Sequence, residues 1–211
     1  MSTPPIMGFP ATSQDDYQLN VINILRHAAR TFGRQQIVAY SMAGVQRTTY
    51  ADTYRRVQRL ANALKQLGAE PGDRIGVMDW NSLRHFEAYY GVPGIGAVLL
   101  LLNIRLAPPD LIYVINHAEA KFILVDETLL PLIAAVAPKL ETVKGYVVMT
   151  NKPLTNIQTD LAPLYGYEEI LAAAEDTYKW DMKRRQGYPV VGLDLKKEIR
   201  ESYRDIYTEE G

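Results

Sequence analysis

The stretch Arg74–Leu102, RIGVMDWNSLRHFEAYYGVPGIGAVLLLL, sets up an alternation of strand and helix. Its first segment, Arg74–Met78, is short and rich in β-branched residues, as buried strands are. Ser82–Val92 is expected to form a helix. Ala97–Leu102 is apolar at every position, so we expect a strand that is covered on both faces. Strand, helix and strand in this order predict a parallel unit of a larger sheet.

The alternation continues on both sides of this stretch. Apolar spacing and breaker residues predict helices over Val21–Thr31, Tyr54–Leu67, Pro108–His117, Leu129–Leu140 and Tyr167–Ala174, and strands over Gln36–Tyr40, Gln46–Tyr50, Phe122–Val125 and Tyr146–Met149. Thr49 and Asp52 resemble a capping box at the start of a helix. We therefore predict an α/β fold with a mostly parallel sheet and helices on its faces, followed by an amphipathic helix at Leu195–Tyr207.

Composition excludes several classes of protein. Among 211 residues, Lys and Arg total 23 and Asp and Glu total 24, and this balance gives no general attraction to nucleic acid. The absence of cysteine excludes disulfides, thiolate metal sites and a cysteine nucleophile. The run Val92–Leu102 is about half of the ~20 residues that a membrane helix needs, and Met1–Gln14 lacks the pattern of a secretory signal. We expect a cytoplasmic protein without a membrane span.

Characteristic motifs follow one another along the chain. They are TYAD at Thr49–Asp52, RLANAL at Arg59–Leu64, PGDRI at Pro71–Ile75, AYYGVPGIGAVL at Ala88–Leu99 and NHAEAK at Asn116–Lys121. In this order they resemble the N-terminal part of the medium- and long-chain fatty acyl-CoA synthetases, which form AMP and belong to the adenylate-forming superfamily. The resemblance extends over about Tyr17–Trp180.

The resemblance implies activation of a fatty acid with ATP and Mg, followed by transfer of the acyl group to coenzyme A. In the family, a loop rich in Ser, Thr and Gly that ends in Pro-Lys-Gly holds the triphosphate, and it follows soon after the position of Trp180. Here Asp181–Gly187 follows instead, and neither Ser nor Thr occurs between Lys179 and Ser202. Gly192–Tyr203 resembles the end of the family's C-terminal lid, with Leu193 in place of a lysine. The middle of the family sequence is therefore expected to be missing.

We accordingly divide the chain into a truncated synthetase-like domain (1–178), a junction (179–191) and a lid-like helix (192–211). By resemblance the function is that of a fatty acid–CoA ligase that is incomplete and inactive alone, with no cofactor of its own. The alternative is a non-catalytic interaction module, which forms a homodimer or binds a full-length synthetase. An apolar face left exposed by the missing part would favour this alternative.

Candidate ligand contacts are Asn81, Arg84 and Asn103, which the resemblance places near strand ends, where open α/β sheets bind ligands. The family commonly has His-Thr where this chain has Leu100-Leu101, and this departure weakens the case for chemistry at the end of that strand. We expect no catalytic residue in this chain.

Four further features could suggest a function, but a simpler interpretation is preferred for each. No metal site is expected, because His27, His85 and His117 lack partners at metal-binding spacing. Asp79 and Glu87 could form a carboxylate pair for acid–base chemistry, but solvated surface positions explain them more simply. The glycines of Gly91–Gly96 follow the pattern GxxGxG, which predicts close packing of helix and strand rather than a phosphate loop. The basic cluster Lys183–Arg185 is expected to be a solvated linker rather than an anion site.

Overall fold

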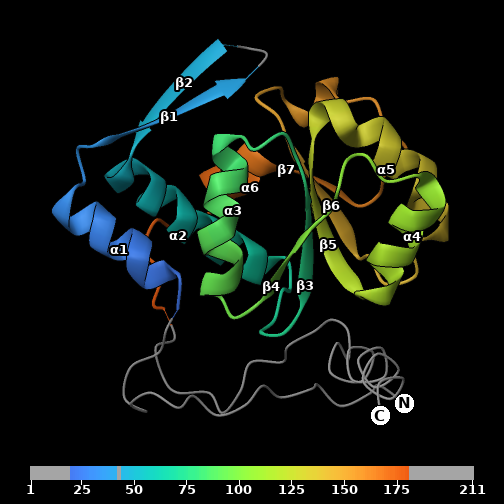
Figure 1. Ribbon diagram of the computed structural model, residues 1–211, viewed down its shortest axis with the longest axis horizontal. Coiled ribbons are helices and arrows are strands. Elements are labelled where there is room, and N and C mark those ends of the chain that lie inside the picture. Colours follow the sequence, from blue (N-terminus) through green and yellow to red (C-terminus); the bar gives the residue numbers. More distant parts are fainter. Residues whose placement is uncertain (1–19, 42–43, 181–211) are drawn as a thin grey trace, which may run out of the picture.

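Five parallel strands form the central sheet of the computed structural model, which describes residues 20–41 and 44–180 (Figure 1). Along the sheet the strands are β4 (Val98–Leu101), β3 (Arg74–Met78), β5 (Ala120–Asp126), β6 (Gly145–Met149) and β7 (Leu164–Gly166). Each neighbouring pair runs parallel. The predicted α/β class with a parallel sheet is confirmed, and β7 is a strand that the sequence analysis did not identify.

Helices cover both faces of the sheet. The first core cluster joins the sheet to α1 (Ile22–Thr31), α2 (Tyr50–Gln66), α3 (Leu83–Gly94) and α6 (Tyr167–Ala172). The second core cluster, on the other face, contains α4 (Pro108–His117) and α5 (Leu130–Val136). Figure 1 shows α4 and α5 on one side and α1, α2 and α3 on the other. Turns of 3-10 helix occupy Glu127–Leu129, Ala137–Lys139 and Leu154–Asn156.

The helix α2 begins at its predicted cap. The side chain of Thr49 accepts a hydrogen bond from the backbone N–H of Asp52 at 3.1 Å, and its hydroxyl donates to the Asp52 carboxylate at 2.7 Å. The helix then buries a stripe that includes Val57, Leu60 and Leu64. The apolar stripe predicted a helix that begins at Tyr54, but α2 begins four residues earlier, at Tyr50. The reason is that the cap at Thr49, and not burial, determines where the first turn starts.

The two strands before α2 form a separate hairpin. β1 (Gln36–Ser41) pairs antiparallel with β2 (Gly44–Thr49), and together they make a two-stranded sheet apart from the central one (Figure 1). The prediction of two short strands here is confirmed. The predicted helix Leu129–Leu140 is shorter than expected, since α5 ends at Val136 and a 3-10 turn containing Pro138 follows.

The strand predicted over Ala97–Leu102 contacts a core cluster on each face, through Leu99 and Leu100, but the expected complete burial is wrong. β4 lies at the edge of the sheet, its residues Val98–Leu100 are half-buried, and the Leu101 side chain is 51% exposed. By contrast, every residue of the inner strand β6 is buried. The chain passes from β4 across β3 to β5, which leaves β4 outermost, and an apolar run does not reveal this order.

Some predictions fall outside the described residues. These are the helix Leu195–Tyr207, the basic cluster Lys183–Arg185 and the boundaries that separate a junction from a lid-like helix. Within residues 20–41 and 44–180, none of the helices has the length and apolar character that crossing a membrane requires.

Candidate functional site

The carboxyl ends of β3 and β5 form the natural place for a site. The chain leaves β3 toward β4 on one side and leaves β5 toward β6 on the other, so the connections diverge between these two neighbours. Ligands of open α/β sheets bind at such a point. The loops after the two strands are tied together, because the Trp80 indole N–H donates to the Thr128 hydroxyl at 2.9 Å.

A buried Asp–His pair follows β3. The Asp79 carboxylate, whose side chain is fully buried, accepts a hydrogen bond from the Ser82 backbone N–H at 2.8 Å. Its Oδ2 also lies 3.5 Å from Nδ1 of His85. Burial alone would raise the pKa of Asp79, but His85 and the hydrogen bonds from Ser82 lower it below its usual value. Asp79 therefore stays ionised.

Asp79, His85 and Ser82 do not form a nucleophilic triad. The Ser82 hydroxyl caps α3 by accepting the backbone N–H of His85 at 3.4 Å. Neither ring nitrogen of His85 has a hydrogen-bond partner among the described residues, so the imidazole is not placed to take a proton from Ser82. Its ring instead stacks on Tyr89, with centroids 5.1 Å apart. His27 and His117 are exposed.

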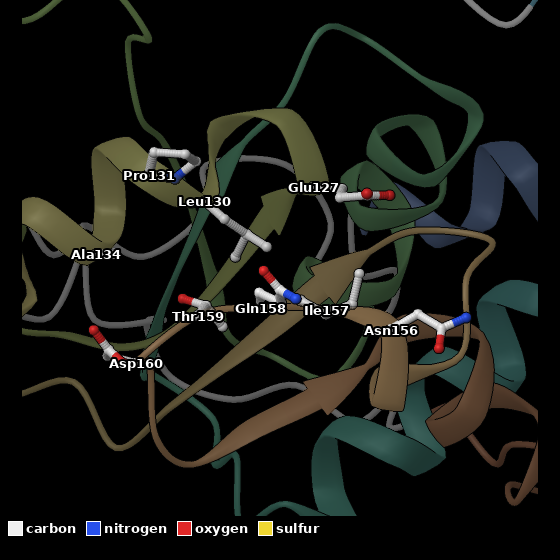
Figure 2. Close-up of a pocket in the computed structure, with 9 residues that line it drawn as sticks. All are labelled: Glu127, Leu130, Pro131, Ala134, Asn156, Ile157, Gln158, Thr159 and Asp160. Carbon is white, nitrogen blue, oxygen red and sulfur yellow. The ribbon is translucent and has the colours of Figure 1, made fainter.

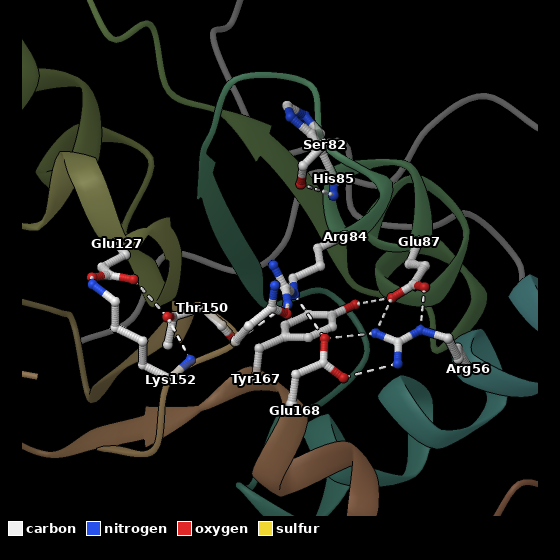
Figure 3. Close-up of polar contacts among 11 residues, drawn as sticks. Arg56, Ser82, Arg84, His85, Glu87, Glu127, Thr150, Lys152, Tyr167 and Glu168 are labelled. Carbon is white, nitrogen blue, oxygen red and sulfur yellow. Dashed lines mark hydrogen bonds and ion pairs between the residues drawn. The ribbon is translucent and has the colours of Figure 1, made fainter. Parts of the chain in front are cut away.

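A cluster of charged side chains joins three helices on one face of the sheet (Figure 3). Arg56 of α2 donates to Glu87 of α3 at 2.5 Å and to Glu168 of α6 at 2.8 Å. The Tyr167 hydroxyl donates to Glu87 at 2.8 Å, and Arg84 donates to Glu168 at 2.8 Å. We call these five residues the charge cluster. Every charge in it meets an opposite charge, which offsets the cost of burying the Glu87 carboxylate.

The pKa values of the charge cluster follow from burial and pairing. Burial raises the pKa of Glu87, although hydrogen bonds from Arg56 and Tyr167 work in the opposite direction. Burial would also raise the pKa of Glu168, but the two arginines lower it below its usual value. The Tyr167 hydroxyl is fully buried beside Glu87, and its pKa is raised. The arginines thus hold Glu168 as an anion.

The interpretation of Asp79 and Glu87 as solvated surface carboxylates is wrong. Asp79 is 8% exposed and Glu87 is 3% exposed. They do not form a catalytic pair either, because Asp79 belongs to the cap of α3 whereas Glu87 bonds Arg56 and Tyr167. The partner of Glu87 is Arg56, which lies 31 residues earlier in the chain, and a pair at this separation leaves no local pattern in the sequence.

The three candidate ligand contacts lie at different places. Arg84 is held by Glu168, by the Thr150 carbonyl at 3.2 Å and by Asn151. Asn81 is exposed in the loop before α3, with a left-handed backbone (φ 62°). Asn103 is exposed after β4 and accepts the Arg105 backbone N–H at 2.9 Å. Within the described part of the chain, no hydrogen bond or ion pair joins these three residues, and their role in ligand binding stays a prediction.

The carboxyl ends of β5 and β6 carry a second polar group. The Thr150 hydroxyl donates to Glu127 at 2.6 Å, and Lys152 forms an ion pair with the same carboxylate (Figure 3). Beside Glu127 opens a pocket of about 310 Å³ between α5 and the segment before β7 (Figure 2). Its lining is Glu127, Leu130, Pro131, Ala134, Asn156, Ile157, Gln158, Thr159 and Asp160. Two carboxylates and no cation line it, so it does not suit an anionic ligand.

The glycines of Gly91–Gly96 serve packing, as predicted, but their main neighbours are not a strand. A Cβ on Gly91 would lie 2.7 Å from the Leu60 side chain on α2, and one on Gly94 would lie 2.6 Å from Trp180. Gly96 has a φ of 81° in the turn before β4. The space a phosphate would need is thus filled by Leu60 and Trp180.

No group of three or more His, Asp or Glu side chains within residues 20–41 and 44–180 could hold a metal ion. The carboxylates of the region are engaged by arginine, lysine or backbone N–H groups instead.

Comparison with known proteins identifies one family and several relatives. The family described as AMP-binding enzyme matches residues 25–169. A long-chain-fatty-acid–CoA ligase of Thermus thermophilus is 46% identical over 172 residues, which are 80% of this chain and 30% of that protein. A medium-chain-fatty-acid–CoA ligase of Ectopseudomonas oleovorans is 37% identical over 164 residues, 77% of this chain and 30% of the relative. The chain therefore spans less than a third of the length of these relatives.

The solved structures agree on the fold. The crystal structure of the anthranilate CoA ligase AuaEII in complex with anthranoyl-AMP superposes with a TM-score of 0.72 at 20% identity, over 85% of this chain and 32% of that one. At this identity the likeness concerns the fold alone.

Proposed function

Since this chain belongs to the AMP-binding enzyme family, we propose that it is the first portion of a ligase that joins a medium- or long-chain fatty acid to coenzyme A. The observation that carries the proposal is the 46% identity to the long-chain ligase of Thermus thermophilus over 80% of this chain. The medium-chain relative supports the same class of acid. The family chemistry requires ATP, Mg and coenzyme A, and a cytoplasmic location suits these substrates.

Alone, the chain does not form an acyl-adenylate. A triphosphate needs backbone N–H groups of a glycine-rich loop together with available cations. Arg56, Arg84 and Lys152 are each already paired with a carboxylate. Asp181–Gly187, where the family resemblance places the phosphate loop, contains no Ser or Thr. These three cations are thus not free to hold the phosphates of ATP, and no step of adenylation is assigned to them.

This portion contributes a rigid support for the binding site of the complete ligase. The charge cluster ties α2, α3 and α6 together over one face of the sheet, and Trp80 with Thr128 ties the loops at its carboxyl end. Rigid elements of this kind hold loops in the geometry that a binding site requires. The remaining length of the ligase is proposed to supply the phosphate loop and the chemistry.

Reconstitution tests the proposal. The chain is mixed with the part of the Thermus thermophilus ligase that lies beyond its matching region, and acyl-CoA is measured by mass spectrometry with octanoate or palmitate, ATP, Mg²⁺ and coenzyme A. We expect product from the mixture and none from either part. As a control, the Thermus part is mixed with its own N-terminal region. Product with that region but none with this chain contradicts the proposal, as does product from this chain alone.

A non-catalytic interaction module is the second candidate, and the exposure of Leu101 on the edge strand favours it. Light scattering tests this role. A particle larger than one chain supports self-association, and a monomer at all concentrations contradicts it.

A further inference from the structure

We propose that the pocket between α5 and the segment before β7 binds a linear diamine, whose two ammonium groups pair with Glu127 and Asp160. The inference goes beyond the proposed ligase activity and does not depend on it, because it rests only on the groups in and around the pocket. The volume of about 310 Å³ is at the small end of the range for small-molecule sites, ~300–1,000 Å³. We call this cavity the acidic pocket.

The two carboxylates of the acidic pocket lie apart from each other. Figure 2 shows Glu127 and Asp160 toward opposite sides of the lining, with Leu130 and Gln158 between them. Among the described residues that line the pocket, none is Lys, Arg or His. A ligand with a positive charge at each end and an apolar middle therefore matches the lining. A linear diamine is the simplest compound of this kind.

Glu127 already binds a primary ammonium group within the protein. The Lys152 ammonium forms an ion pair with its Oε1, and the Thr150 hydroxyl donates to its Oε2 at 2.6 Å. Hydrogen bonds from Lys152 and Thr150 lower the pKa of Glu127 below its ordinary value, so the carboxylate stays ionised. The Lys152 side chain is 60% exposed, and an exposed pair of this kind is weak. An ammonium group of a ligand can therefore take the place of Lys152 or share the carboxylate with it.

Asp160 supplies the second anion. Its side chain is exposed, and within residues 20–41 and 44–180 it has no hydrogen bond or ion pair. Asn156 and Gln158, which also line the pocket, carry amide oxygens that can accept hydrogen bonds from an ammonium group. The second ammonium group of a diamine thus finds an ionised partner that no cation of the described residues occupies.

The floor of the acidic pocket is apolar and preformed. Leu130, Ala134 and Ile157 line it, and all three belong to the second core cluster or pack against it. The opposite wall is held by two hydrogen bonds. The Ile157 N–H donates to the Leu154 carbonyl at 2.9 Å, and the Leu154 N–H donates to the Glu169 carboxylate at 3.0 Å. The methylene groups of a diamine lie against this floor, and a preformed site loses less entropy on binding.

NMR of the isotope-labelled full chain tests the site, with straight-chain diamines from diaminopropane to diaminooctane as probes. We expect an affinity that peaks at one chain length, because two fixed carboxylates select one separation of the ammonium groups. Shifts of backbone amide signals should be confined to residues 127–134 and 156–160. Hexylamine, which has a single ammonium group, should bind about five-fold more weakly than the best diamine.

Substitutions locate the binding groups. Asp160→Asn should weaken binding of the best diamine by about five-fold, and it should keep the fold because Asp160 is exposed. Ala134→Leu should weaken binding without a change of charge, since the added carbons fill the floor. Lys152→Met should strengthen binding by about two-fold or more, because it removes the competitor for Glu127. Glu119→Gln is the matched control, since Glu119 is 68% exposed and lies at the other end of β5.

Four results overturn the inference. Equal affinity for hexylamine and the best diamine removes the second ammonium contact. An equal loss of affinity in Glu119→Gln and Asp160→Asn shows that general charge, and not the pocket, attracts the diamine. Unchanged or weaker binding by Lys152→Met removes Glu127 from the site. Amide shifts that spread over the surface, or that are absent at the highest diamine concentration, show that the acidic pocket is not a binding site.

Discussion

The charge cluster and the outer edge of β4 (Val98–Leu101) differ in how fully their polar groups are paired within the described residues. In the charge cluster, Arg56 and Glu87 meet opposite charges within hydrogen-bond distance. At the edge, the backbone groups of Leu99 and Leu101 face outward and one leucine is half exposed. The comparison shows that the charged groups of α2, α3 and α6 are paired with one another, whereas no strand of the described residues lies beyond β4. Stability should respond to the first region and association to the second.

The largest expected effect is that of Glu87→Ala on stability. It leaves Arg56 without one of its two carboxylates and the buried Tyr167 hydroxyl without its acceptor, so we expect a loss of about 3–5 kcal/mol in the free energy of unfolding. Urea denaturation followed by circular dichroism measures it. Glu119→Ala is the control, because Glu119 is 68% exposed in its pair with Arg74 and should cost only about 0–1 kcal/mol. An equal loss of unfolding free energy in the two variants would show that the contacts of the charge cluster do not stabilise the fold more than a surface ion pair does.

A smaller loss is expected from Gly91→Ala, at the contact between α3 and α2. The new Cβ would lie 2.7 Å from the Leu60 side chain, and overpacking of this kind costs about 1–3 kcal/mol. The clash should largely disappear in a Leu60→Ala background, so a double-mutant cycle measured by urea denaturation should give a coupling of about 1 kcal/mol or more. Strict additivity of the two substitutions would contradict this packing.

The charge cluster also predicts a pH dependence. Because the arginines lower the pKa of Glu168 below its ordinary value of 4.5, its contribution is present above that value and is lost as the pH falls through the folded-state pKa. The raised pKa of Glu87 acts in the opposite sense, lowering stability as the pH rises above 4.5. The stability difference between wild type and Glu168→Gln should therefore shrink between about pH 6 and about pH 3. A difference that is constant over this range would contradict the assigned pairing.

The smallest effect on stability should come from Leu101→Lys. Since Leu101 is 51% exposed, the substitution should change the free energy of unfolding by only about 0.5 kcal/mol, whatever it does to association. Thermal denaturation of the isolated chain measures this. A loss of ~2 kcal/mol or more would mean that the edge is part of the domain's own core.

Local patterns predicted the fold better than the site. Three features depend only on residues close together in the sequence, which was therefore enough to predict them. They are the apolar stripe of α2, its cap at Thr49 and the buried strand Arg74–Met78. The order of strands is a long-range property, and the apolar run of β4 therefore suggested an inner strand where the structure has an edge. Glu87 bonds Arg56, which lies 31 residues earlier in the chain, and Tyr167, which lies 80 residues later. Contacts over such separations leave no local pattern, which is why this carboxylate was wrongly assigned to the surface.

The central claim is that this chain supplies rigid structural elements of a ligase but no groups that bind the triphosphate of ATP. Exchange of radioactive pyrophosphate into ATP, with the purified full chain, Mg²⁺ and medium- or long-chain fatty acids, tests this claim most directly, because exchange requires adenylation and nothing later. We predict exchange no faster than in the absence of protein. Acid-dependent exchange clearly above that background would contradict the account.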